Sequence, residues 1–213
     1  MRTARSMLRS RTAAFSALAA VAVAAGAGTS AHGTPPARQT QARATGTAEF
    51  RLPYPEDDDV RSIAFDAHGA PYSRPVPGVP TGLPTDAHGT PRVSHHSAEK
   101  DTAYTADGRV DCLVTAPGSA TLTAVVTHVS PGGPDWVGRR IGISVRDGGA
   151  DGHGRAPRDR VGFSWDDGVN TTYGEQGPVP HAVGPCMAPA PFAPVTAGGY
   201  RVRHAELPPW PSA

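Results

Sequence analysis

The sequence predicts an all-β protein, an antiparallel β-sandwich or open barrel of about eight short strands, and three observations support this prediction. Proline (23) and glycine (25) together exceed a fifth of the 213 residues, which favours strands joined by turns over long helices. Several segments alternate apolar and polar residues with the period of a half-buried strand. After residue 31, no segment shows a helical apolar stripe of useful length.

The first 31 residues are typical of a secretory signal peptide. They combine a basic start, an apolar stretch at 13–25 and small residues up to Ala31. The apolar stretch is shorter than the roughly 20 residues that span a membrane. We therefore expect a secreted, extracellular product without stable membrane insertion. Residues 32–47 hold no apolar side chain larger than alanine, apart from their prolines, and predict a disordered leader.

The charge balance argues against nucleic acid as a partner. Beyond residue 31 the chain carries 16 basic and 19 acidic residues, a net charge of −3. Non-specific binding to nucleic acid or to anionic membranes needs clustered positive charge. We expect a monomer that uses no cofactor.

The predicted β-domain spans 48–207, and a flexible tail, 208–213, follows it. Its centre is a hairpin at 108–129, which has the longest strand-like alternation in the chain. The residues expected on one face of its first strand are Val110, Cys112 and Val114. Those expected on the buried face of its second strand are Ala120, Leu122, Ala124 and Val126. Further strands are expected at 48–52, 60–66, 92–97, 102–105, 141–145, 161–165 and 200–207.

The two cysteines, Cys112 and Cys186, predict one disulfide, because an exported chain enters an oxidising compartment. The alternative, a reactive or metal-bound thiolate, needs a neighbouring Cys or His at metal-ligand spacing. Neither cysteine has one in the sequence. The bridge would close a loop of about 75 residues and contribute about 4 kcal/mol.

Metal sites have weak candidates. The units Asp66–Gly69 and Asp86–Gly89 both read Asp-Ala-His-Gly, and their histidines, His68 and His88, would converge if the intervening loop folds back. Zinc needs three or four ligands, and the same units also fit ordinary turn chemistry. Weak calcium candidates lie in a glycine-rich loop that lacks EF-hand spacing. They are Asp147, Asp151 and Asp159. We expect no metal.

No catalytic motif is present, so the sequence names no catalytic residue. It lacks the G-x-S-x-G elbow, the H-E-x-x-H helix and the phosphate-binding glycine loops. His95 and His96 are adjacent, so on a strand they would point to opposite faces. The acidic run 56–59 has the composition of a solvated turn. The candidate binding aromatics are Trp136, after a turn, and Tyr173, in a polar loop.

Six segments carry a resemblance to known proteins. They are DDDVRSIAFDAHG, VDCLVTAPGSATLTAVVT, VGRRIGISVRDGG, RDRVGFSW, CMAPA and YRVRHAEL, in this order. This arrangement resembles a group of secreted actinobacterial proteins, some of them labelled repetin-like, of unassigned function. The resemblance covers roughly residues 49–207. It implies export and a compact β-domain, and it identifies no catalytic residue.

Together these observations predict an exported extracellular β-module that binds a protein or a glycan. Its contact surface would be the loops 67–91, 147–159 and 170–185, since loops on a rigid scaffold usually carry function. The alternative is a small secreted hydrolase whose acidic residues converge only in the fold. The sequence favours the binding module over the enzyme.

Overall fold

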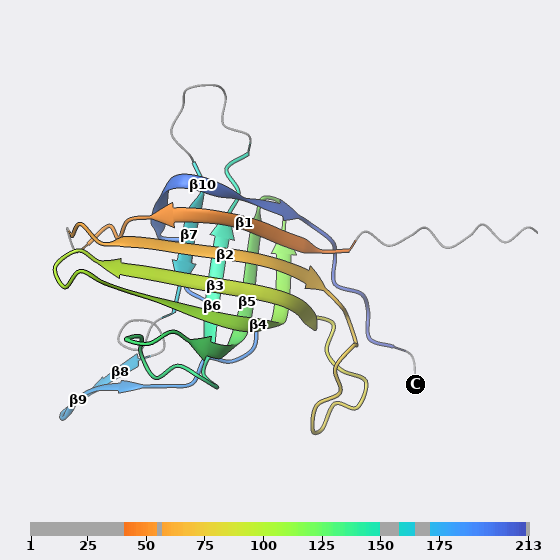
Figure 1. Ribbon diagram of the computed structural model, residues 1–213. Helices are drawn as coiled ribbons and strands as arrows, with labels where there is room; N and C mark the ends of the chain where they lie inside the picture. The colour runs from red at the N-terminus through yellow and green to blue at the C-terminus, as the bar shows by residue number, and fades with distance from the viewer. Residues whose placement is uncertain (1–40, 55–56, 150–157, 165–170, 212–213) are drawn as a thin grey trace, which may run out of the picture. The chain divides into compact units, whose positions relative to one another are not determined.

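The computed structural model describes residues 41–54, 57–149, 158–164 and 171–211 (Figure 1). The predicted signal peptide lies outside the described residues. All regular structure in the described part of the chain is β-strand. The strands are β1 (Arg43–Phe50), β2 (Val60–Gly69), β3 (Ala87–Ser97), β4 (Thr102–Ala116), β5 (Ser119–Val129), β6 (Arg140–Arg146), β7 (Arg160–Phe163), β8 (Thr171–Gly174), β9 (Gly177–Pro180) and β10 (Ala193–Arg203).

Eight of these strands form a closed barrel in the order β1-β10-β7-β6-β5-β4-β3-β2, and every neighbouring pair is antiparallel. The predicted all-β fold of about eight antiparallel strands is confirmed. Closure leaves the main sheet without an unpaired edge. Strands β8 and β9 pair only with each other, in a separate hairpin. Within the described residues, no helix is long and apolar enough to cross a membrane.

Alternate residues of each strand fill the barrel interior. The largest fully buried side chains include Ile63, Leu113, Leu122 and Ile143. The residues that the first half of β1 turns toward the barrel interior are small, and this leaves room for the ring of Tyr200. That ring stacks on Phe65 with centroids 5.1 Å apart, and its hydroxyl donates to the backbone oxygen of Ile63 over 3.1 Å. Burial raises the pKa of Tyr200 above that of an ordinary tyrosine.

The central hairpin is present, but its first strand differs from the prediction at one point. A bulge at Asp111 breaks the pairing, so that Val110 lies opposite Ala124 and Cys112 opposite Thr123. Because one extra residue reverses the alternation, Val110 and Leu113 both join the interior cluster. Cys112 is therefore turned to the outer surface of the sheet. The predicted buried face of β5 is correct: Ala120, Leu122, Ala124 and Val126 are all buried.

The disulfide Cys112–Cys186 is confirmed, with Cα atoms 5.3 Å apart. It ties the segment before β10 against the outside of the barrel. Thr123, which is fully buried, accepts a hydrogen bond from the Cys186 backbone amide over 3.1 Å and donates one to the Asp111 carboxylate over 2.6 Å. Arg140 donates to the other oxygen of that carboxylate over 2.7 Å. The tether thus covers a hydrogen-bonded polar cluster.

Several predicted boundaries were wrong. Strand β1 begins at Arg43, inside the predicted leader, because its alanines and glycine pack inward while both edges pair with neighbours. The first Asp-Ala-His-Gly unit lies in β2 and the second enters β3 at Ala87, so the loop between these strands spans only 70–86. The hairpin β8–β9 forms where irregular chain was expected. The predicted flexible tail is held by hydrogen bonds, because its backbone oxygens at Pro208 and Pro209 accept from the hydroxyl of Tyr72.

Candidate functional site

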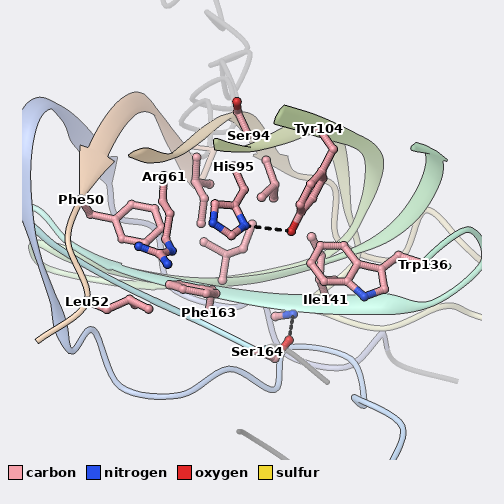
Figure 2. Close-up of a pocket in the computed structure, with 14 residues that line it drawn as sticks. Phe50, Leu52, Arg61, Ser94, His95, Tyr104, Trp136, Ile141, Phe163 and Ser164 are labelled. Atoms are coloured by element: carbon pink, nitrogen blue, oxygen red, sulfur yellow. Dashed lines mark hydrogen bonds between the residues drawn. The ribbon is translucent and has the colours of Figure 1, made fainter. Parts of the chain in front are cut away.

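One end of the barrel contains a partly enclosed cavity of about 260 Å³ (Figure 2). It lies where β2, β4 and β6 begin and where β1, β3 and β7 end, as expected for antiparallel neighbours. Most of its wall is apolar. The apolar lining side chains are Phe50, Leu52, Ile63, Val93, Trp136, Ile141, Ile143 and Phe163. A partly enclosed apolar space with few polar groups is the usual form of a small-molecule site.

Apart from two serines, the polar side chains of the cavity come from a single row across the sheet. Arg61 of β2 pairs in register with His95 of β3, and His95 pairs with Tyr104 of β4. The row continues to Phe50 of β1, which lies opposite Arg61. All four residues line the cavity. Side chains directly opposite each other on one face of a sheet have Cβ atoms about 5 Å apart, so this register brings the four into contact.

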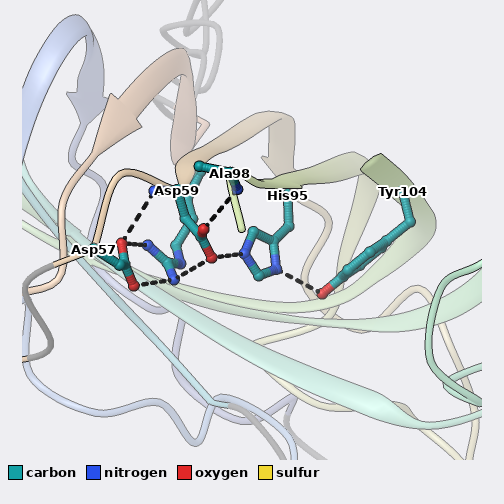
Figure 3. Close-up of polar contacts among 6 residues, drawn as sticks. Asp57, Asp59, His95, Ala98 and Tyr104 are labelled. Carbon is teal, nitrogen blue, oxygen red and sulfur yellow. Dashed lines mark hydrogen bonds and ion pairs between the residues drawn. The ribbon is translucent and has the colours of Figure 1, made fainter. Parts of the chain in front are cut away.

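Arg61 is held by two carboxylates from the segment that precedes β2 (Figure 3). Its two terminal nitrogens donate to the two oxygens of Asp57, over 2.8 and 2.7 Å, and one of them also donates to Asp59 over 3.0 Å. Neither carboxylate lines the cavity. The hydrogen bonds from Arg61 hold the pKa of Asp57 below its ordinary value, and Asp57 raises the pKa of Arg61. All three groups are therefore charged at neutral pH.

Asp59 also holds His95. Its Oδ2 lies 2.7 Å from His95 Nε2, and its Oδ1 accepts the backbone amide of Ala98 over 2.9 Å. The hydrogen bond with His95, followed by that with Ala98, lowers the pKa of Asp59. An ionised carboxylate only accepts, so Nε2 of His95 carries the proton.

The proton on Nε2 determines the hydrogen-bonding role of the other imidazole nitrogen, Nδ1. In a neutral His95, Nδ1 is an acceptor, and it lies 3.3 Å from the hydroxyl of Tyr104. With the imidazole in that state, the Tyr104 hydroxyl donates to Nδ1. Asp59, His95 and Tyr104 form one directed chain of hydrogen bonds that ends at a phenol on the cavity wall (Figures 2 and 3).

Aromatic rings support this chain and close the wall around it. Tyr104 meets His95 edge-on, with centroids 5.4 Å apart, and meets Trp136 edge-on at 6.1 Å. On the opposite wall, the ring centroids of Phe163 and Phe50 lie 5.1 Å apart. Such contacts fix the orientation of rings in an apolar setting. The site can hold a flat apolar molecule between aromatic walls.

The structure places two of the four predicted binding residues together, but not at the cavity. His68 and His88 lie directly opposite each other on β2 and β3, with their rings stacked 5.3 Å apart. They did converge, although through strand pairing instead of loop closure. His68 Nε2 contacts Asp66 over 2.9 Å. Among the described residues, no group of three or more His, Cys, Asp or Glu could hold a metal ion.

Trp136 does line the cavity. Tyr173 lies in β8, opposite Pro178. Of the calcium candidates, Asp151 lies outside the described residues. Asp147 and Asp159 each accept two backbone amides, which occupies an oxygen pair at each carboxylate. Through these hydrogen bonds, Asp147 and Asp159 anchor the loop after β6 and strand β10.

Sequence reasoning missed Arg61, Asp59 and Tyr104, and treated the acidic run 56–59 as a solvated turn. It did separate His95 from His96: the first faces the cavity, whereas His96 contacts Asp101 at the surface. One signal was available. In β2, Ile63 and Phe65 are buried at alternate positions, so Arg61 has the parity of an interior residue. A charge at such a position marks a functional candidate.

Comparison with protein-family models, curated proteins and solved structures finds no match for this chain. The resemblance to secreted actinobacterial proteins stays a prediction.

Proposed function

We propose that this protein binds a small, uncharged and mostly apolar molecule inside one end of its barrel. The observation that carries the proposal is the partly enclosed cavity of about 260 Å³, with its aromatic walls and a short polar row. Soluble barrels of eight strands are just wide enough to hold one small ligand. Filling this space would remove apolar surface from water on both partners.

The volume limits the size of the ligand. A buried apolar cavity of about 150 Å³ accepts benzene, so a space of about 260 Å³ accommodates one or two fused rings, or roughly 10–14 non-hydrogen atoms. Sites for drug-sized ligands start at about 300 Å³. A polysaccharide chain is too large to enter.

The charged side chains beside the cavity limit the chemistry of the ligand. With neutral His95, the cluster of Asp57, Asp59 and Arg61 carries two negative charges and one positive charge, a net charge of −1. An anionic ligand would add a further negative charge to a poorly solvated space, at a cost that rises as the dielectric constant falls. A neutral hydroxyl or carbonyl can hydrogen-bond to the polar row without that cost. We therefore favour an uncharged aromatic alcohol or ketone.

Export is part of the proposal. The predicted signal peptide and the Cys112–Cys186 disulfide support it, because disulfides persist in oxidising compartments. The earlier predictions of a protein or glycan partner, and of a secreted hydrolase, stay predictions. The small-molecule reading has more support, since it rests on a partly enclosed apolar cavity instead of on loop surfaces.

Calorimetric titration of the full-length, oxidised protein with 2-naphthol tests the proposal. We expect saturable binding with one site per chain. Val93→Trp, which fills the cavity, should abolish binding, and Leu52→Trp should weaken it at a wall position without altering a fully buried core side chain. Val60→Trp is the matched control, because Val60 is 49% exposed on the outer face of β2. Equal binding by the wild type and Val93→Trp would refute the proposal.

A further inference from the structure

The chain Asp59–His95–Tyr104 does more than an inert binding pocket requires. A ligand hydroxyl or carbonyl needs one donor or acceptor on the wall, and Tyr104 alone supplies both. Here the phenol is backed by an imidazole, and the imidazole is backed by a carboxylate. A nucleophile or proton-transfer group, its base and a third group that orients the base form the recurring arrangement of activated side chains.

We propose that the cavity is a proton-transfer site, in which the Tyr104 phenol, activated by His95 and Asp59, removes a proton from carbon in a bound, uncharged carbon acid. This inference rests on the proposed binding function, because it uses the same cavity. It adds a reaction class, isomerisation or elimination started by a base, and a substrate class, a flat ketone or heterocycle with an acidic C–H bond.

The steps follow from the directed hydrogen bonds. With His95 neutral, the Tyr104 hydroxyl donates to Nδ1, so transfer of that proton produces a phenolate beside an imidazolium. Asp59, 2.7 Å from Nε2, stabilises the imidazolium. The phenolate takes the proton from the substrate carbon, and the electron pair of that C–H bond moves into the substrate. The imidazolium gives its proton to the product, which restores the starting state.

The surroundings favour the phenolate. The charge that stabilises the phenolate is the imidazolium formed beside it, because Arg61, the cation in the same cross-strand row, is already offset by Asp57 and Asp59. The apolar walls lower the local dielectric around these charges. Asp57 does not line the cavity and remains paired with Arg61. Tyr104 and His95 would be the catalytic residues, and Asp59 a positioning residue.

A probe reaction tests this assignment without knowledge of the natural substrate. In 5-nitrobenzisoxazole, loss of the C3 proton to a base breaks the N–O bond and gives a cyanophenolate, the conjugate base of an isomer of the probe. With this probe the imidazolium then gives its proton to water. No oxidant, reductant or co-reactant is needed. The probe is uncharged, flat and of the size that the cavity accepts. Its product is coloured, so the full-length, oxidised protein can be assayed directly.

We expect saturable turnover by the wild type. Tyr104→Phe should lower kcat about 100-fold, and His95→Gln should do the same, because general-base catalysis contributes about 10²–10⁴-fold. Asp59→Asn should lower kcat about 10-fold or more by releasing the imidazole. Tyr104→Phe keeps the ring and its contacts, so its dissociation constant for the probe should change by less than about 3-fold. His96→Gln, on the outer face of the same strand, is the matched control and should keep full activity.

The outcomes separate the two proposals. If the wild type binds the probe but turns it over no faster than Tyr104→Phe, the proton-transfer role is refuted and the binding cavity stands. If neither protein binds the probe, and the wild type also fails to bind 2-naphthol, the binding proposal fails and the inference falls with it. If Tyr104→Phe loses turnover and binding in equal measure, the phenol only positions the ligand, and the catalytic assignment is refuted.

Discussion

Removal of the disulfide should cost the barrel about 4 kcal/mol of stability. The bridge joins residues 74 positions apart, and closing a loop of that length restricts the unfolded chain by about 4 kcal/mol in the chain-entropy description. The double variant Cys112→Ala/Cys186→Ala should therefore melt about 10 °C below the wild type, at roughly 2–4 °C per kcal/mol for a domain of this size.

The native fold should survive that change, because the tether has other contacts. Thr123 accepts from the backbone amide of residue 186, and Arg140 donates to the backbone oxygen of Val183 over 3.1 Å. Urea titration measures the loss. We expect a higher m-value along with the lower stability, since the unfolded double variant exposes more surface than the cross-linked chain.

Backbone conformation supplies a sharper test within the same experiment. Cys186 has φ of 55°, in the left-handed region that costs a residue with a side chain about 1 kcal/mol or more. Cys112→Ala/Cys186→Gly should therefore be more stable than the double alanine variant by about 1 kcal/mol. A loss below about 1 kcal/mol for the double alanine variant would refute the entropic account. A less stable glycine variant would refute the account of residue 186.

Three further predictions concern the barrel frame and are measured by urea unfolding. Asp159→Ala should lose about 3 kcal/mol, because buried Asp159 accepts the amides of Tyr200 and Gly148. Asp135→Ala, at an exposed site, is the control, and equal losses would contradict the anchor role. Gly46→Ala should lose about 3 kcal/mol, because a Cβ there would lie 2.2 Å from a backbone oxygen, whereas Gly174→Ala, whose Cβ would meet nothing closer than 4.0 Å, should be near neutral. Acid should destabilise the fold as pH falls below about 4, because the pKa values of Asp57 and Asp59 are lowered from 3.8 in the folded state. Their contribution to stability is present above that pH and is lost as the two carboxylates gain protons. The free energy of unfolding of Asp57→Asn/Asp59→Asn should therefore depend less on pH between pH 4 and 2.

The sequence predicted the fold class because strand alternation is a local property. The run from Ala120 to Val126 and the alternation at 141–145 both correspond to buried faces of β5 and β6. The bulge at Asp111 was not predictable in the same way. It depends on the count of residues on two strands that pair, and a pattern of Val110, Cys112 and Val114 looks regular until the pairing with Thr123 is known.

The start of β1 was missed for a related reason. Residues 43–47 are small or polar, so they show little hydrophobic signal of their own. They form a strand because they lie between β2 and β10, and because Gly46 leaves space for Tyr200. Tertiary contacts outweigh local composition at such sites.

The candidate site could not be assembled from the sequence. The spacing of Arg61, His95 and Tyr104 along the chain matches no known motif. Only the register of β2, β3 and β4 brings them into one row. Asp59 joins them through a side-chain contact that no local pattern specifies. Trp136 was singled out as a binding aromatic, but its place on the cavity wall follows from the closed barrel.

The central claim is that the barrel end is a ligand site, and nuclear Overhauser contacts between 2-naphthol and the protein test it most directly. The account predicts contacts from the ligand protons to the indole of Trp136 and to the rings of Phe163 and Tyr104, from both walls of the cavity. It also predicts none to the stacked histidines His68 and His88 on the outer face. Contacts confined to residues outside the cavity, or no contacts at saturating ligand, would contradict the claim.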